Sequence, residues 1–373
     1  MNIRLKTPTS ALLRSARSHS QIGIALIIVL IVIVVLAGMA SGFAWFMKVE
    51  MKLATNHLSD SELEWLGRSG VELARYVVGQ QLNINEPCDC LNQKWAGGPG
   101  QTNQLLENVF LDDNYLGNGV FSVYITDNER KMNINTATDV LIENALSVMG
   151  VDATLASTIS DSILDWRDDD DDAKLSGAED EYYLGLMPPY YCKNGPLDDI
   201  SELLLIQGVD PELYYGIARL EGRSPRSTFV DTDEMRIGQD RYADEMVFEG
   251  GLMDLFCTLS SGTVNINTAP AEVLQMLPDM TPEIANEIIS YRNGLDGVEA
   301  TEDDIQISNI NMLMQIGGIP EAVIQQLGAF CGFRSTVFEV EVVAEIEGQQ
   351  RTFSSMLHRV SAKDVRILYF QWK

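Results

Sequence analysis

The most constraining feature of this sequence is an apolar segment near the N-terminus, residues 24–47, that contains no charged side chain. Its centre is the run IIVLIVIVV at residues 27–35. An α-helix rises about 1.5 Å per residue, so a helix over this segment reaches across a hydrocarbon core of roughly 30 Å. We therefore expect a membrane-spanning helix.

Charge is distributed unevenly around that segment. The charged side chains before Lys48 are all basic, and the first acid of the chain is Glu50. A basic N-terminal flank stays in the cytoplasm, so the leader is expected there and the body on the other side of the membrane. A conventional secretory signal has a shorter apolar stretch and a small-residue cleavage site. Because residues 40–42 form only a weak site of that kind, we expect the helix to remain in the mature protein.

The body of the chain is strongly acidic, with 26 Lys and Arg against 54 Asp and Glu and a net charge of −28. Affinity for nucleic acid depends on basic side chains that displace counterions, so this composition disfavours it. Divalent cations and basic partners are the more natural ligands. No glycine-rich phosphate loop or Gly-x-Ser-x-Gly motif occurs, and the three histidines have no clear catalytic setting. We expect a protein that is not an enzyme, with no catalytic residues.

Five cysteines fit an oxidising compartment, and their odd number leaves at least one outside an internal disulfide; they are Cys88, Cys90, Cys192, Cys257 and Cys331. Cys88 and Cys90 are too close in sequence for a comfortable disulfide with each other. A Cys-x-Cys pair without a second pair or a histidine cluster is a poor zinc site. Structural disulfides are therefore favoured over a metal, and their pairing stays open.

Period-two patterns near the two ends of the body predict one small sheet. Residues 119–125 alternate as a strand does, and so do residues 338–342, followed by candidate strands at 351–359 and 365–372. Between the apolar segment and these strands, residues 48–81 have helical periodicity. The pattern indicates a long N-terminal helix whose second half packs on an antiparallel sheet.

Two copies of the sequence NINTA, at residues 133–137 and 265–269, mark an internal repeat. Each copy is expected to open a short helix, with Thr136 or Thr268 near its cap. A second helix and then a further helical pair follow in each copy; the expected ranges are 151–165 and 200–217, then 282–292 and 307–328. The repeat predicts two related all-helical modules in tandem, inserted between the strands of the sheet.

The densest charge of the chain lies at residues 161–181, where ten acids face only Arg167 and Lys174. Carboxylates that arrive from the two ends of one loop can surround a hard cation, which takes 6–8 oxygen ligands. The predicted metal ligands are Asp168, Asp170, Glu179 and Asp180, and the predicted ion is Ca²⁺. The spacing is not that of an EF-hand. The alternative is a solvated acidic loop, which runs of like charge usually form.

The paired helices also resemble helix-hairpin-helix units of DNA-binding and competence proteins. In those units a glycine hairpin presents backbone N–H groups to phosphate. The hairpins here, at residues 149–152 and 277–280, are acidic and short of glycine. A helical packing module without a ligand is therefore favoured, and a membrane-anchored DNA receptor of competence type remains the alternative function.

Several motifs, taken together, resemble the minor pseudopilin K family of the bacterial type II secretion system (general secretion pathway protein K). The apolar helix begins at Ile24 directly after Gly23, which matches the family's prepilin-peptidase site. The family's central signature is matched in order by Asp165-Trp166-Arg167-Asp168, Gly177-Ala178-Glu179-Asp180 with Tyr182-Tyr183, Pro188-Pro189-Tyr190, Asn194 with Pro196-Leu197, and Ser201-Glu202-Leu203. The resemblance covers nearly the whole chain.

This resemblance implies an α+β fold in which a pilin-like long N-terminal helix packs on a small antiparallel sheet. The large all-helical insertion would consist of two tandem helix-hairpin-like (SAM-like) modules. The implied segments are a leader at 1–23, a membrane helix at 24–47, the first pilin-like part at 48–130, helical modules at 131–225 and 226–334, and final strands at 335–373.

The resemblance also implies a function and partners. The protein would be a single-pass bacterial inner-membrane protein at the tip of a short periplasmic filament that drives export of folded proteins across the outer membrane. Prepilin peptidase would cleave between Gly23 and Ile24, with methylation of the new N-terminus. The implied partners are minor pseudopilins I, J and H and the inner-membrane platform of the secretion system, and the implied cofactor is Ca²⁺ in the acidic segment.

The fifth residue counted from Ile24 bears on the place in the filament. Pilin-type helices resemble one another in carrying a glutamate there, which neutralises the N-terminal amine of the subunit ahead. This chain has Ile28 instead. An unpaired charge at that depth is expensive, so a subunit without the carboxylate suits the tip, where no subunit lies ahead. The alternative is that Ile28 reflects a generic membrane anchor.

Overall fold

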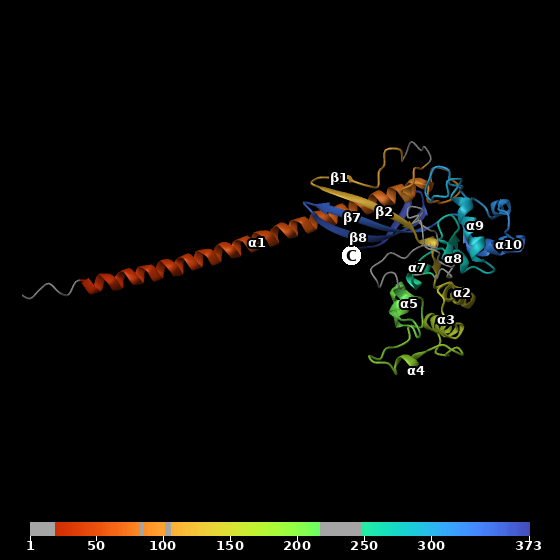
Figure 1. Cartoon of the computed structure of the whole chain (residues 1–373), viewed down its shortest axis with the longest axis horizontal. Coiled ribbons are helices and arrows are strands. Elements are labelled where there is room, and N and C mark those ends of the chain that lie inside the picture. The colour runs from red at the N-terminus through yellow and green to blue at the C-terminus, as the bar shows by residue number, and fades with distance from the viewer. Residues whose placement is uncertain (1–18, 83–85, 101–105, 217–247, 249) are drawn as a thin grey trace, which may run out of the picture. The chain divides into compact units, whose positions relative to one another are not determined.

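The computed structural model describes residues 19–82, 86–100, 106–216, 248 and 250–373, with side chains of the first helix described for 25–54 and 59–81. The chain divides into two compact units, Met1–Glu62 and Leu63–Lys373. Helix α1 (His19–Gln81) begins in the first unit and ends in the second (Figure 1). Residues 1–18 of the expected leader and the side chains of Gly23 and Ile24 lie outside the described residues.

In the first unit, α1 has apolar side chains on all its faces. Leu26 is 70% exposed, Phe43 68% and even Val32, in the middle of the apolar run, 49%. A helix that is apolar all round is typical of a membrane span. Among the described residues, α1 is the one helix long and apolar enough to cross a membrane.

The second unit contains a five-stranded antiparallel sheet in the order β1-β2-β7-β8-β9. The strands are β1 (Asn114–Leu116), β2 (Gly119–Asp127), β7 (Val337–Ile346), β8 (Gln349–Ser361) and β9 (Asp364–Trp372). Side chains alternate between the two faces, so Val123 is 1% exposed while its neighbour Tyr124 is 54% exposed. The four strands expected from the period-two patterns are confirmed; β1 had no such pattern.

The last turns of α1 pack against one face of this sheet through small residues. A Cβ atom on Gly67 would lie 2.5 Å from Cδ2 of Phe353, and one on Gly70 would lie 2.5 Å from Cγ1 of Val342. Glycine therefore lets the helix backbone approach the strands closely. The buried side chains that α1 adds to this core are Leu63, Leu66, Val71, Ala74, Val77 and Val78.

A long insertion leaves the sheet after β2 and returns to it at β7, the strand paired with β2. Asp127, at the end of β2, is opposite Phe338 in the register. The described helices of the insertion are η3 (Asn128–Arg130), α2 (Asp139–Val148), α3 (Ala153–Arg167), α4 (Asp180–Tyr183), η4 (Ile200–Leu205), α5 (Pro211–Tyr215), α7 (Leu252–Leu255), α8 (Ala271–Gln275), α9 (Pro282–Arg292), η5 (Ile310–Gln315) and α10 (Glu321–Phe330).

Two short parallel pairings tie each NINTA copy to a distant segment. Strand β3 (Met132–Asn133), where the first copy starts, pairs with β4 (Phe256–Cys257). Strand β5 (Val264–Asn265), where the second copy starts, pairs with β6 (Cys331–Gly332). The expected boundary between modules at residues 225 and 226 lies outside the described residues.

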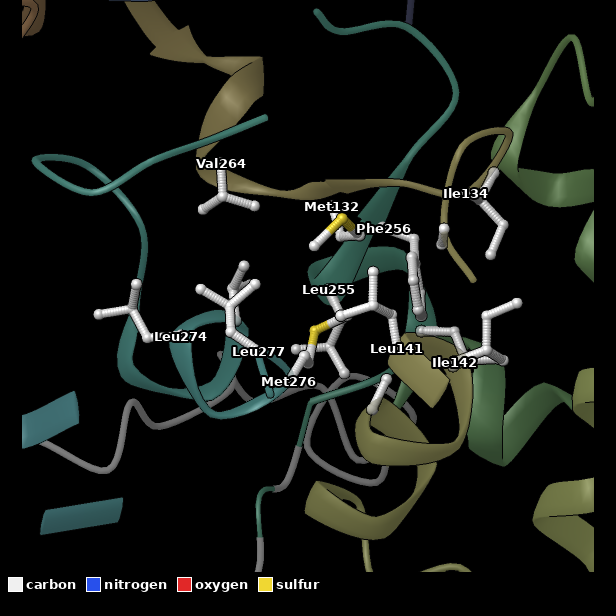
Figure 2. Close-up of a cluster of buried hydrophobic side chains, with 14 of the residues drawn as sticks. Met132, Ile134, Leu141, Ile142, Leu255, Phe256, Val264, Leu274, Met276 and Leu277 are labelled. Carbon is white, nitrogen blue, oxygen red and sulfur yellow. The ribbon is translucent and has the colours of Figure 1, made fainter. Parts of the chain in front are cut away.

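One hydrophobic core continues through both NINTA regions. Figure 2 shows Met132 and Leu141 from the first copy in the same cluster as Leu255, Met276 and Leu277. All five side chains are at most 3% exposed. The helices of the two copies therefore stabilise each other by sharing one dry interior, and neither has a separate core.

Local details of the helices differ from the expected ones. Thr136 lies near the cap of α2, as expected, but its hydroxyl donates to the Asn133 carbonyl at 3.3 Å. The N-cap itself is Thr138, which accepts from the Leu141 N–H. Helix α3 begins at Ala153 because Asp152 caps it. The leading members of the expected second helical pairs, η4 and η5, are short 3-10 helices and not α-helices.

Candidate functional site

An arginine at the end of a helix fixes each NINTA copy. Arg167, the last residue of α3, donates through Nη2 to the carbonyl of Ala137 at 2.6 Å. Arg292, the last residue of α9, donates through Nη1 to the carbonyl of Ala269 at 2.7 Å. Ala137 and Ala269 are the last residues of the two NINTA sequences. The same contact therefore sets where the loop after each helix begins.

The second asparagine of each NINTA holds a distant segment by a two-way hydrogen bond. Asn135 accepts from the Leu197 N–H at 2.8 Å and donates to the Leu197 carbonyl at 2.9 Å. Asn267 makes the same pair with Ile307, at 2.8 and 2.9 Å. Each side-chain amide thus bonds both the N–H and the carbonyl of one residue, as a neighbouring β-strand does with its backbone. It thereby fixes the segment that follows the loop.

In the first copy, acids within α3 fold the acidic loop back onto the helix. Asp165, which is fully buried, accepts from the Lys174 N–H at 3.1 Å and from Lys174 Nζ at 3.2 Å. Asp161 accepts from the Ser176 N–H at 3.0 Å. A Cβ atom on Gly177 would lie 1.9 Å from Oδ2 of Asp165, so only glycine fits there.

The structure separates the four predicted metal ligands into two pairs. Asp170 accepts from the Asp172 N–H at 3.0 Å, and Asp180 accepts from the Cys192 N–H at 2.8 Å. By contrast, Glu179 is 5% exposed, and neither of its carboxylate oxygens accepts from an N–H or hydroxyl donor among the described residues. The thiol of Cys192 is the one side-chain donor that acts on it there. Oδ1 of Asp168 is likewise buried without a partner, while its Oδ2 lies 3.0 Å from Lys174 Nζ.

A further residue with an unpartnered oxygen is Asn194, which the sequence analysis did not select as a ligand. Its Oδ1 is buried without a partner among the described residues, while its Nδ2 donates to Asp171 at 2.8 Å. Its φ of +47° is one that asparagine tolerates, so the Asn-Gly pair at 194–195 was the available signal. Buried oxygens without donors are costly, and a cation would satisfy them.

The donor chemistry of this loop fits a hard cation, because every unpartnered atom is a carboxylate or amide oxygen. No three His, Cys, Asp or Glu side chains lie close enough to hold a metal ion in the described part of the chain. A cation bound in this conformation would have to complete its shell with amide, backbone or water oxygens.

The electrostatics of the loop oppose ionisation of its buried acids. Burial raises the pKa of Glu179, a side-chain hydrogen bond from Cys192 acts in the opposite direction, and the negative charges of the neighbouring acids Asp165, Asp168 and Asp171 raise it further. Burial also raises the pKa of Asp165, although hydrogen bonds from Lys174 act in the opposite direction. A bound cation would reverse this balance by favouring the carboxylate forms.

An aromatic cluster forms a rigid base beneath the acidic loop. The rings of Trp166 and Tyr183 meet edge to face at 5.2 Å, and Tyr183 stacks on Tyr190 at 5.3 Å. Trp166 and Tyr183 are buried, and Tyr190 Oη donates to the Leu205 carbonyl at 2.6 Å. Both ends of the loop, at Arg167 and at α4, are therefore anchored in packed structure.

The corresponding loop of the second copy, residues 293–304, satisfies its own central acid. Asp303 accepts from the Leu295 and Asp296 N–H groups at 2.7 and 3.1 Å and from Thr301 Oγ1 at 2.8 Å. These hydrogen bonds lower the pKa of Asp303 to about 2. The two copies thus differ: one loop supplies its own donors, and the other leaves acid oxygens unpartnered.

Two protein families match separate parts of the chain. The family described as type II secretion system (T2SS), protein K, matches residues 121–220, and the helix-hairpin-helix motif matches residues 260–331. Type II secretion system protein K of Klebsiella pneumoniae is 26% identical over 210 residues, which are 53% of this chain and 61% of that protein. The protein K of Pseudomonas aeruginosa is 24% identical over 300 residues, 76% of each chain.

A further relative and a solved structure agree with these matches. The protein K of Aeromonas hydrophila is 28% identical over 211 residues, 61% of its length, so this match and the Klebsiella match each span less than two thirds of the relative. The crystal structure of the GspK-GspI-GspJ complex from the enterotoxigenic Escherichia coli type 2 secretion system contains a similar chain. It has a TM-score of 0.61 and 20% identity, and the match covers 86% of this chain and 99% of that one. At this identity the likeness concerns the fold.

Proposed function

We propose that this chain, a relative of type II secretion system protein K, is a minor pseudopilin of a type II secretion pseudopilus. The observation that carries the proposal is the protein K match over residues 121–220. That range holds β2, the first NINTA copy, the acidic loop and the aromatic cluster beneath it. A long N-terminal helix with an apolar first half and an antiparallel sheet, both expected for a pilin-like domain, support the same assignment.

We further propose that the protein initiates and caps the filament. Ile28 supplies no carboxylate to a subunit ahead, and an unpaired amine in lipid would be expensive. The insertion at residues 128–336 makes a head too bulky for another subunit to stack above it. A generic membrane anchor would also explain Ile28, but it would not explain the insertion.

The partners we propose follow from the relatives. The solved complex contains proteins named GspK, GspI and GspJ, so pseudopilins of types I and J, with H below them, are the proposed neighbours. The prepilin peptidase and the inner-membrane platform are the proposed partners during processing and assembly. With its net charge of −28, the chain presents an acidic body that basic surfaces on such partners would complement.

We propose a single-pass inner-membrane location with the leader in the cytoplasm and the body in the periplasm. The basic residues before Lys48 and the acids from Glu50 onward support this orientation. Cleavage between Gly23 and Ile24 would leave a mature chain that begins with the apolar helix.

We propose that the acidic loop binds Ca²⁺. Asp168 and Glu179 would contribute buried carboxylate oxygens, and Asn194 would add an amide oxygen. Asp170 and Asp180, which already accept backbone N–H groups, would join them only if the loop closes further around the ion, because no three acids of the described residues lie close enough to hold a metal together. The ion would supply positive charge that holds the two ends of the loop together. The protein's own part is to position these oxygens through Arg167 and the aromatic cluster.

We also propose that the insertion consists of two tandem helix-hairpin-like modules. Equivalent residues make equivalent contacts in the two copies: Arg167 and Arg292 each bond the last carbonyl of a NINTA sequence, and Asn135 and Asn267 each bond a following segment. The helix-hairpin-helix match at 260–331 supports the same proposal. Because helix-hairpin-helix units also occur in DNA-binding proteins, that match is the observation that favours the alternative function, a membrane-anchored DNA receptor. The hairpin at residues 277–280 carries Asp279 at its turn, which a phosphate backbone would repel.

Co-purification tests the proposed function. The full-length chain is expressed with pseudopilins of types H, I and J, extracted in mild detergent and purified by a tag on this chain. We expect the I and J types to co-purify, and chelation of calcium to reduce their yield. Recovery of this chain alone, together with retention of duplex DNA at physiological salt, would favour the DNA-receptor alternative.

A further inference from the structure

Cys88 and Cys90 lie in the loop after α1 with their sulfur atoms 2.9 Å apart. Both residues are buried, at 2% and 5% exposed. Nonbonded carbon atoms already pack at about 3.5–4.0 Å, and sulfur is larger than carbon. A disulfide bond is about 2.0 Å long. The separation therefore lies between that of a nonbonded contact and that of a bond, and in this structure the two residues are free thiols in direct contact.

We propose that Cys88 and Cys90 form a disulfide with each other in the mature protein. This differs from the sequence-based expectation that the two are too close in sequence for a comfortable disulfide. The inference rests on the proposed location of the body in an oxidising compartment. Each thiol loses one proton and one electron as the sulfur–sulfur bond forms. A thiol oxidant of that compartment, itself a disulfide, accepts both electrons and both protons and becomes a dithiol.

The other cysteines have different surroundings. The thiols of Cys192 and Cys257 each lie 3.9 Å from a backbone carbonyl oxygen, and burial raises the pKa of each to about 12. Burial also raises the pKa of Cys331 to about 12. Within the described residues, Cys88 and Cys90 are thus the pair whose sulfurs meet, which leaves three cysteines outside the bond.

The bond would stabilise a joint centred on Asp89, the residue between the two cysteines. The Asp89 N–H donates to the Phe333 carbonyl at 2.8 Å, and the Asp89 carbonyl accepts from Asn265 Nδ2 at 3.0 Å. The Asp89 carboxylate pairs with Arg359 of β8. The loop therefore connects the sheet with the second NINTA copy, and a disulfide across Asp89 would hold its backbone in the shape that these contacts need.

Mass spectrometry of the full-length protein tests the bond directly. Protein made in an oxidising compartment is denatured in the presence of N-ethylmaleimide, which labels free thiols. It is then digested with trypsin, and the peptide of residues 76–94 is analysed. We expect that peptide without label and lighter by two hydrogens than its reduced form, and with two labels after dithiothreitol. Two labels before reduction, or a cross-link from this peptide to one holding Cys192, Cys257 or Cys331, would overturn the inference.

Hydrogen exchange at the Asp89 amide tests the structural role. In wild-type protein, reduction should accelerate this exchange several-fold, and oxidised glutathione should restore the slow rate. Cys331→Ala, at an equally buried position, should behave as wild type. The double variant Cys88→Ala with Cys90→Ala should exchange fast in both conditions. Both measurements use the isolated protein. Failure of the chain to co-purify with pseudopilins would therefore not contradict the disulfide, and free thiols at Cys88 and Cys90 would not contradict the proposed function.

Discussion

The guanidinium of Arg359 pairs with the carboxylate of Asp89 in the interior of the second unit, and both side chains are 2% exposed. Arg359 also donates to the carbonyl of Val78 in α1 and to that of Ser335, so one side chain connects the helix, the loop after it and the sheet. A buried pair of this kind is expensive to break, because removal of one partner leaves the other charge without compensation.

Arg359→Met should therefore lower the free energy of unfolding by about 3–5 kcal/mol. The matched control is Arg366→Met, which breaks the solvent-exposed pair with Asp364 and should change the free energy of unfolding far less, because water and salt screen an exposed pair. Denaturant unfolding of the detergent-solubilised chain measures both. Equal losses of unfolding free energy in the two variants would show that the buried pair stabilises the protein no more than the exposed pair does.

Calcium should raise the melting temperature of the full-length protein. Binding to the folded chain alone stabilises it by mass action, over the micromolar to millimolar range of protein calcium loops. Asp168→Ala combined with Glu179→Ala should abolish the rise. Asp303→Ala, in the loop that supplies its own donors, should retain it. A response that survives the double substitution would place the ion elsewhere.

In chelator, stability should depend on pH through Glu179. Because the pKa of Glu179 is raised in the folded chain, the folded state binds this proton more tightly than the unfolded state does. The contribution of this group is therefore greatest in acid and is lost as pH rises above its ordinary value of 4.5. Glu179→Gln should melt above wild type at pH 7, with the difference shrinking towards pH 5. A difference that grows towards pH 5 would contradict the assignment.

Gly70→Ala should destabilise the protein, because the new Cβ atom would lie 2.5 Å from a methyl carbon of Val342. Overpacking of this kind costs about 1–3 kcal/mol. Gly328→Ala is the control: it lies within α10 with nothing within 4 Å of the new atom. There the gain in helix propensity, up to about 1 kcal/mol, should raise stability. Denaturant midpoints of the two variants should move in opposite directions.

Labelled protein on assembled filaments should mark one end only, because Ile28 and the insertion both suit a terminal subunit.

N-terminal sequencing of the same material should begin at Ile24. Regular decoration along the shaft would refute capping, and a mature chain that starts at Met1 or after Gly42 would refute the processing.

The parts of the fold that local sequence determines were predictable. Helix α9 has the expected bounds, because Thr281 caps it and Pro282 occupies its first position, where a missing N–H costs nothing. The strands that alternate on a buried face were equally clear. Thr136 shows the limit: a threonine near a helix start has two backbone partners within reach, and here it bonds the carbonyl of Asn133 and leaves the cap to Thr138.

The candidate metal site was only partly predictable from its acids. Charge density identified the segment, but it did not show which oxygens the backbone would satisfy. Asp170 accepts from the nearby Asp172 N–H in a local turn. Asp180, by contrast, obtains its donor from Cys192, which the fold brings to it, and Asn194 enters from beyond α4. Such contacts depend on tertiary structure, and a residue list carries no record of them. The proximity of the Cys88 and Cys90 sulfurs depends in the same way on the path of one turn.

The pairing of Asp127 with Phe338 has a consequence for how such proteins diversify. Because the insertion leaves and re-enters the sheet at facing positions, its length does not affect the register of β2 against β7. Loops in the interior of the insertion can change length without shifting this ladder, whereas its ends are fixed, because Glu129 accepts from the Thr336 and Val337 N–H groups. The inserted part can therefore change size and surface, while the helix and sheet from which it projects remain the same.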